Sequence, residues 1–188
     1  MLHTLQQKSD TTYFCTITCY RWLPLFSESN CYDSVYRWFE HLKNDGCYVV
    51  AYVIMPNHLH VLLHLVHKGT SLSHLVSPGK RFMAYDIVNA LERLKKHDLL
   101  TIMKNGVQAK EKMKGKKHQV FRLSFDSREC DTEKMMLQKL YYIHQNPVRG
   151  KWLLVDDFAD YEHSSACFYE LNKPARFPVT HYADLGTL

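Results

Sequence analysis

Residues 48–66 have the sequence YVVAYVIMPNHLHVLLHLV, in which two apolar runs are joined by Pro56 and Asn57. The first run, Tyr48 to Met55, is apolar and rich in β-branched residues, as expected for a buried strand. The second run, His58 to Val66, has the length and composition of another strand. The two-residue connection predicts that they pair as an antiparallel hairpin.

Further elements are expected on both sides of this hairpin. Hydrophobic periodicity predicts strands at Thr11–Trp22 and Gln119–Phe125, and helices at Tyr32–Leu42, Lys80–Lys96 and Thr132–Gln145. Gly69–Pro78 is expected to be a turn or a short helix, and residues 151–188 are irregular. This order predicts an α+β fold, with an antiparallel sheet that helices cover on one face. The other face, or an edge, is then free to carry a site.

The helix expected over Lys80–Lys96 has apolar residues at regular steps of three. We expect this stripe to face the core, with the charged residues on the solvent side. The stripe consists of Phe82, Tyr85, Val88, Leu91 and Leu94.

The composition is that of an ordinary globular protein. The chain has 188 residues, of which 46% are hydrophobic and 23% charged, so one domain with a sizeable core is expected. No apolar run approaches the roughly 20 residues of a membrane span. Met1–Lys8 lacks a signal pattern, so a cytoplasmic location without membrane contact is expected. The six cysteines form no Cys-x-x-Cys pair, which favours reduced thiols over a structural zinc site.

A lysine cluster lies between residues 104 and 117. Its charge, after subtracting Glu111, equals the net charge of +5 of the whole chain. A basic segment on a neutral body suits a polyanion, because contacts with phosphates release counterions. A solvated surface loop explains the same pattern equally well. The cluster comprises Lys104, Lys110, Lys112, Lys114, Lys116 and Lys117.

The second strand of the hairpin begins with His58-Leu59-His60. Alternate residues of a strand point to the same face, so both imidazoles can converge on one ion while Leu59 turns into the core. His64 lies on the same face, and His67 follows it. Twelve histidines in this chain make one such pair unsurprising by chance. The position directly after a tight turn favours a site, because strand ends often present functional residues.

The segment from Leu140 to Arg149, LYYIHQNPVR, places two tyrosines at the end of a helix. Residues i and i+4 share a helix face, so Tyr141 pairs with Gln145 and Tyr142 pairs with Asn146. Taken alone, two tyrosines that simply pack remain the simpler interpretation.

The apolar stripe favours Tyr142 as the freer phenol. A phenol is a poor nucleophile at pH 7, because its pKa is about 10. A divalent metal beside a phosphate would neutralise phosphoryl charge and align the attack, so a histidine pair and a nearby tyrosine explain each other. The stripe expected to face the core is Leu137, Leu140, Tyr141 and His144, which leaves Tyr142 on the polar side.

Four sequence elements resemble those of the single-tyrosine HUH transposases (IS200-like), and in particular the branch associated with repetitive extragenic palindromes (REP). Residues 55–62, MPNHLHVL, look like the HUH motif, and residues 142–149, YIHQNPVR, look like the tyrosine motif of that branch. Residues 161–165, YEHSS, resemble its aromatic-x-x-Ser-Ser element, and Arg81-Phe82 matches a basic-aromatic pair. The similarity spans about residues 11–170.

The resemblance implies a ferredoxin-like antiparallel sheet and a catalytic domain over residues 1–170, followed by a C-terminal tail over 171–188. It implies that His58, His60 and Asn146 hold Mg²⁺ or Mn²⁺. Tyr142 would attack single-stranded DNA beside a hairpin, forming a 5′-phosphotyrosine and releasing a 3′-hydroxyl. In the insertion-sequence branch a glutamine takes the fourth position, a pattern that Tyr141 with Gln145 would satisfy. The lysine segment looks longer than is usual in the family.

The resemblance leaves other questions open. A domesticated protein that binds DNA or RNA hairpins without cleavage would use the same fold, through basic and aromatic side chains. Members of the family include monomers as well as homodimers that complete the site with a partner's tyrosine helix. The residues expected to bind nucleic acid are Lys80, Arg81, Lys110, Lys112, Lys114, Lys116, Lys117 and Arg149.

Overall fold

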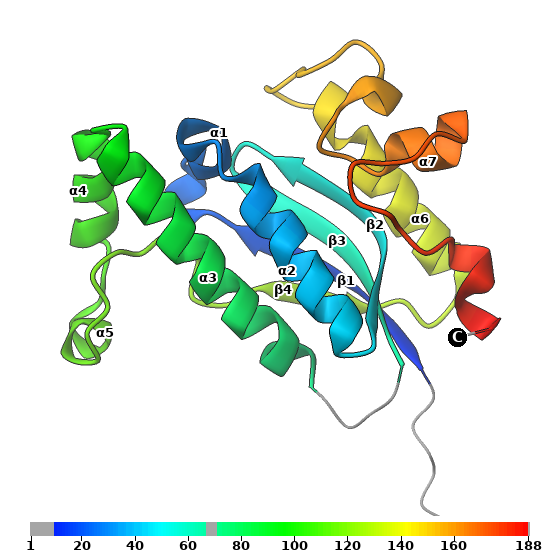
Figure 1. Cartoon of the computed structure of the whole chain (residues 1–188), viewed down its shortest axis with the longest axis horizontal. Coiled ribbons are helices and arrows are strands. Elements are labelled where there is room, and N and C mark those ends of the chain that lie inside the picture. Colours follow the sequence, from blue (N-terminus) through cyan, green and yellow to red (C-terminus); the bar gives the residue numbers. More distant parts are fainter. Residues whose placement is uncertain (1–9, 67–70, 188) are drawn as a thin grey trace, which may run out of the picture.

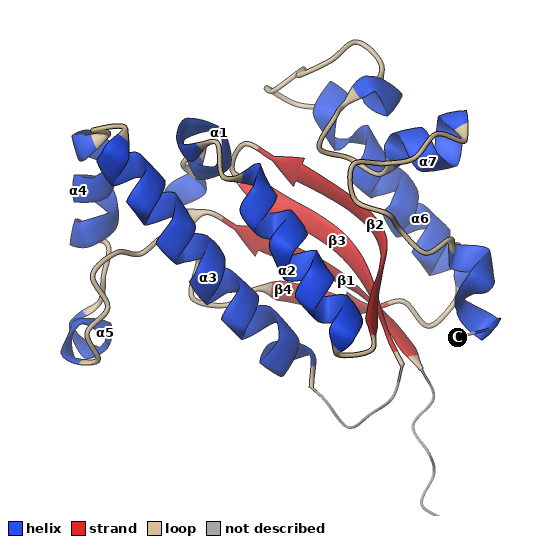
Figure 2. Ribbon diagram, in the orientation of Figure 1, coloured by secondary structure: helices blue, strands red, loops and turns tan. Residues whose placement is uncertain are grey.

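A computed structural model describes residues 10–66 and 71–187 of the chain. The N-terminal stretch Met1–Lys8, which lacks a signal pattern, and His67 lie outside the described residues. Within them the sheet has the order β2-β3-β1-β4, with antiparallel neighbours (Figures 1 and 2). Its strands are β1 (Thr11–Thr18), β2 (Cys47–Met55), β3 (His58–Leu65) and β4 (Asp126–Glu129).

The expected hairpin is confirmed. Met55 of β2 faces His58 of β3 across the two-residue connection. β1 pairs with the other edge of β3, with Thr16 opposite His60 and Thr18 opposite His58. β3 therefore pairs with a strand on each side, so the backbone that carries His58 and His60 is held in place.

The fourth strand lies later in the chain than the sequence predicts. Residues 119–125 contribute one isolated bridge, from Phe121 to Cys19, whereas the ladder with β1 uses Asp126–Glu129. The apolar pattern signalled burial of Val120 and Phe121 rather than strand pairing. β4 itself has the sequence DSRE and is fully exposed, so it carries no hydrophobic signal and resembles a charged edge strand.

Two helices, α2 (Tyr32–Asn44) and α3 (Leu72–Arg93), cover one face of the sheet. They approach closely at Gly79, where an added Cβ would lie 2.4 Å from the Trp38 indole nitrogen. α3 begins within the segment expected as a turn, and Ser71 caps it by accepting from the backbone N–H of His74. The helix continues through Pro78.

The predicted apolar stripe of α3 is wrong in its position. Phe82, Tyr85 and Leu94 are exposed, whereas Leu91 is buried as expected. Steps of three fall short of the 3.6-residue turn, so such a stripe winds around the helix instead of following one face. The face that packs on the sheet consists of Leu75, Val76, Gly79, Met83, Ile87, Ala90 and Leu91.

The α+β class and the antiparallel sheet are confirmed, but helices are not limited to one face. α6 (Glu133–Gln145) packs on the opposite face, where Met136, Leu140 and Ile143 meet residues of β2 and β3 (Figure 1). Residues after 170 also pack on the body, since Phe177 is buried and its backbone N–H donates to the Tyr52 hydroxyl.

The remaining helices are short and connect these layers. α4 and α5 extend beyond the end of α3 and carry Lys104, Lys110 and Lys112 of the lysine cluster (Figure 1). No helix in the described residues has the length and apolar character to cross a membrane. The short helices are η1 (Tyr20–Trp22), α1 (Leu25–Ser29), α4 (His97–Asn105), α5 (Ala109–Met113), η2 (Asn146–Val148), η3 (Phe158–Asp160), α7 (Ala166–Leu171) and η4 (Tyr182–Thr187).

Candidate active site

The first two histidines of β3 lie side by side on the sheet face that α6 covers. His58 and His60 are both buried, and their ring centroids are 4.6 Å apart. Leu59 between them points into the core on the other face, as the strand alternation predicts.

Each of these histidines has a hydrogen-bond partner at its Nδ1 atom. The Asn57 Oδ1 atom lies 2.7 Å from His58 Nδ1, and the Thr16 hydroxyl lies 2.9 Å from His60 Nδ1. A carboxamide oxygen only accepts, so His58 Nδ1–H donates and Nε2 keeps its lone pair. A metal-binding imidazole is usually oriented by a hydrogen bond at the ring nitrogen that does not bind the metal.

Both imidazoles are held in the neutral form. Burial lowers the pKa of His58 to about 4, and a side-chain hydrogen bond with Asn146 acts in the opposite direction. Burial also lowers the pKa of His60 well below its ordinary value, and the charges of His58 and Lys139 lower it further. Neutral imidazole is the form that ligates metals, so the pair is ready for a cation near pH 7.

Tyr142 of α6 lies against this pair in the same chain. Its ring centroid is 5.2 Å from that of His60 and 5.9 Å from that of Phe14, both in edge contacts. The Lys139 ammonium lies 4.8 Å from the Phe14 centroid and 5.8 Å from that of Tyr142. A cation and a half-exposed phenol thus meet beside the histidines.

Tyr141 points elsewhere. The Arg149 guanidinium lies 5.4 Å from its ring centroid and donates to its hydroxyl at 3.4 Å. The expectation that Tyr141 faces the core and Tyr142 is the freer phenol is wrong, since their exposed fractions are 55% and 44%. The buried face of α6 is displaced by one position from the expected stripe, so the phenol beside the histidines is the less exposed one. That buried face is Met136, Leu140, Ile143 and His144.

Asn146 directly follows α6 and joins the tyrosine helix to the histidines. Its Nδ2 atom donates to the Tyr142 carbonyl at 2.7 Å, and its side chain also hydrogen-bonds with His58. Across the described contacts, Asn146 rather than Gln145 reaches the histidine pair.

The residues present fit a divalent cation. Two imidazole nitrogens and one carboxamide oxygen form an incomplete ligand set that leaves positions for water and phosphate oxygens. In the described part of the chain, His, Cys, Asp and Glu form no cluster of three or more with metal-binding geometry. A site here would therefore depend on the amide of Asn146.

The Ser164-Ser165 element fixes α6 to the sheet. The Ser165 hydroxyl accepts from the Tyr52 backbone N–H and lies 2.9 Å from the His144 Nε2 atom. Tyr161, from the same element, donates its hydroxyl to the Ile54 carbonyl. This network connects β2 with the helix that carries Tyr142.

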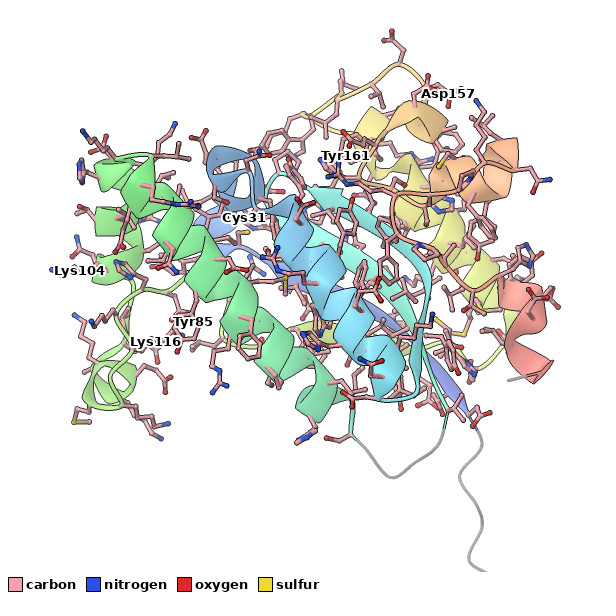
Figure 3. The ribbon with its side chains drawn as sticks, in the orientation of Figure 1. Cys31, Tyr85, Lys104, Lys116, Asp157 and Tyr161 are labelled. Atoms are coloured by element: carbon pink, nitrogen blue, oxygen red, sulfur yellow. The ribbon has the colours of Figure 1, made fainter. Side chains whose placement is uncertain are left out.

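The basic residues expected to bind nucleic acid fall into separate places. Arg81, Lys114, Lys116 and Lys117 line a groove of about 870 Å³ between α3 and residues 111–123. Exposed Tyr85 lines it too, and Figure 3 shows Tyr85 and Lys116 on the same side of the molecule. Lys110 and Lys112 lie on α5, and Arg149 lies beside Tyr141.

Lys80 has a different environment from the other lysines. Its ammonium donates to the carbonyls of Arg122, Leu123 and Ser124 at 2.9, 3.2 and 3.1 Å. These bonds hold one wall of the groove, so Lys80 shapes the groove rather than presenting a free charge.

Several side chains at the site carried no sequence signal of their own. Thr16 and Phe14 belong to β1, and only the β1–β3 register brings them to His60. Trp22 contacts His58, with ring centroids 5.7 Å apart. Asn57 lies in the turn between β2 and β3, but its role as the hydrogen-bond partner of His58 depends on side-chain geometry.

A solved structure shares this fold, although no family model and no curated protein matches the sequence. A REP-associated tyrosine transposase bound to a REP hairpin superposes with a TM-score of 0.56 and 16% identity, over 88% of this chain and 82% of that one. A candidate transposase from Deinococcus radiodurans R1 gives a TM-score of 0.45 and 16% identity, over 77% of this chain and 97% of that one. The resemblance inferred from the motifs is confirmed at the level of the fold.

Proposed function

We propose that this chain is a metal-dependent, single-tyrosine strand transferase that cleaves and rejoins single-stranded DNA beside a hairpin. The observation that carries the proposal is the contact of Tyr142 with His60 and of Asn146 with His58, within one chain. A phenol, a pair of neutral imidazoles and an amide meet at one place, which suits metal-assisted phosphoryl transfer. Because one chain can supply all of them, the proposal does not depend on the tyrosine helix of a second copy.

In the proposed reaction, the Tyr142 hydroxyl oxygen attacks a DNA phosphorus. The bond from this oxygen to phosphorus forms as the bond from phosphorus to the 3′ oxygen breaks. The phenol proton passes to water, and the departing 3′ oxygen takes up a proton from water. A 3′-hydroxyl later attacks the 5′-phosphotyrosine and frees the phenol. One ester replaces another at each step, so ATP is not needed.

His58, His60 and Asn146 would hold Mg²⁺ or Mn²⁺. When bound, the ion would neutralise phosphoryl charge and fix the phosphate beside Tyr142. Asn57 and Thr16 orient the imidazoles, and burial keeps them neutral. Lys139 adds a positive charge beside the phenol, which favours an approaching phosphate.

The groove between α3 and residues 111–123 would bind the hairpin. Its lysines and arginines can contact phosphates, and Tyr85 offers an exposed ring for stacking. The solved REP-associated transposase with the same fold is bound to a REP hairpin, which supports a structured DNA ligand for this chain.

A denaturing gel tests the proposal. The chain would be incubated with Mn²⁺ and a hairpin-flanked single strand from beside its own gene, labelled at either end. A 3′ label should move to a protein-sized band, while a 5′ label should appear on a shorter strand with an extendable 3′-hydroxyl. Both products should disappear with EDTA. A bound hairpin that stays intact in Mn²⁺ would instead favour a binding protein without cleavage.

A further inference from the structure

Trp22 is a large apolar side chain that the fold leaves exposed beside the candidate site. Its exposed fraction is 46%, and its ring makes an edge contact with His58. His58 contacts His60, which in turn contacts Tyr142. Trp22 and Tyr142 therefore adjoin different members of the histidine pair.

The backbone holds Trp22 in a conformation that tryptophan disfavours. Its φ is 59°, and the preceding Arg21 has φ of 52°, so two successive non-glycine residues are left-handed. The Asn57 amide donates to the Trp22 carbonyl at 3.3 Å, and the Trp22 backbone N–H donates to the Cys19 carbonyl at 3.1 Å. Strain of this kind concentrates at functional sites, so it supports a role for the exposed ring.

A cation accompanies the exposed ring. The Arg122 guanidinium lies 5.0 Å from the Trp22 ring centroid, and Arg122 also lines the basic groove. An exposed ring beside an arginine suits a nucleotide, because the ring stacks on a base while the guanidinium meets the phosphate. Trp22 thus lies between the groove and the histidines.

We infer that Trp22 stacks on the base of the nucleotide whose 3′ oxygen departs. The inference rests on the proposed function. In an in-line displacement the leaving oxygen lies opposite the nucleophile. With the phosphate over the histidines and Tyr142 on the His60 side, the departing nucleotide lies on the His58 side, where Trp22 is. Stacking would keep the new 3′-hydroxyl end in place for rejoining.

Fluorescence from 2-aminopurine tests this placement without needing cleavage. In a Tyr142→Phe background, the probe base is moved one position at a time along a hairpin-flanked single strand. Quenching is expected at the base on the 5′ side of the cleavage position. Trp22→Ala should remove it and weaken binding about 10-fold, the size of effect expected when one base loses its aromatic stacking partner. Trp22→Phe should keep part of the quenching and part of the binding affinity.

Two further variants separate stacking from a structural role. Trp152, also beside a lysine, is the matched control, and Trp152→Ala should leave the quenching unchanged. Trp22→Gly should melt at a higher temperature than Trp22→Ala, because glycine adopts positive φ freely, while binding falls equally in both variants. Quenching that survives Trp22→Ala, or that maps to the tyrosine-linked side, would overturn the inference. Failure of the unaltered chain to cleave the same strand in Mn²⁺, with Trp22-dependent quenching intact, would refute the proposed function alone.

Discussion

The ring of Tyr142 lies edge-on to the imidazole of His60, with centroids 5.2 Å apart, and both residues belong to one chain. His60 is fixed on the central strand β3, whereas Tyr142 comes from a helix that starts more than 70 residues later in the chain. The His144–Ser165–Tyr52 hydrogen bonds attach that helix to the sheet. The nucleophile and the ligand pair of the proposed reaction are thus placed by a single folded body.

The hydrogen bond between the Thr16 hydroxyl and His60 should control the affinity of the site for metal. Thr16→Val keeps the shape of the side chain but removes the hydroxyl 2.9 Å from His60 Nδ1. Mn²⁺ affinity, measured by calorimetry, should fall about 10- to 100-fold. A loss of this size is typical when a metal-binding histidine loses the hydrogen-bond partner of its other ring nitrogen. Thr12→Val is a matched control, because Thr12 bonds His64 on the same two strands at 3.0 Å. An equal loss in both variants would contradict the assignment.

Asn146 rather than Gln145 should complete the metal site. Asn146→Ala removes the amide that contacts His58, so Mn²⁺ should stimulate DNA cleavage at least about 10-fold less. Gln145→Ala should retain most of the rate, which single-turnover kinetics over a Mn²⁺ series can measure. The reverse order of effects would support the Tyr141 and Gln145 pairing.

The groove lysines should bind hairpin phosphates. Replacing Lys114, Lys116 and Lys117 with glutamine should weaken hairpin binding and flatten its dependence on salt. Each lost phosphate contact changes the slope of log affinity against log salt by about 0.9 for duplex DNA. Fluorescence anisotropy at several salt concentrations measures the slope. Glutamine at exposed Lys43, Lys95 and Lys173 provides a control of equal charge change, and equal slopes would refute a specific role for the groove.

Acid should destabilise the fold through buried histidines such as His64. Burial lowers its pKa below the ordinary 6.5, with the Asp10 charge acting in the opposite direction, and Nε2 has no hydrogen-bond partner among the described residues. The unfolded state therefore binds more protons below pH 6.5, so stability is retained above that pH and lost as pH falls. His64→Gln should reduce the loss measured by urea unfolding between pH 7 and 5. His74→Gln, at an exposed position, is the control and should leave the pH dependence of the unfolding free energy unchanged. The same pH dependence in both variants would refute this role of His64.

The sequence predicted the parts of the fold in which the pattern of apolar residues is strong and regular. The β2–β3 hairpin and the core position of Leu59 follow from apolar runs and strand alternation. The α3 face was misplaced because steps of three do not follow a helix, and β4 was missed because an exposed DSRE strand has no apolar pattern. The pairing of Thr16 with His60 depends on long-range register, which one sequence does not encode locally.

The most direct test compares two tyrosine variants in the covalent adduct assay. With Mn²⁺ and the hairpin-flanked strand, Tyr142→Phe should form no protein–DNA adduct while binding the hairpin with unchanged affinity. Tyr141→Phe should form the adduct at a rate close to that of the unaltered chain. An adduct that persists in Tyr142→Phe and disappears in Tyr141→Phe would contradict the assignment of Tyr142 as the nucleophile beside His58 and His60.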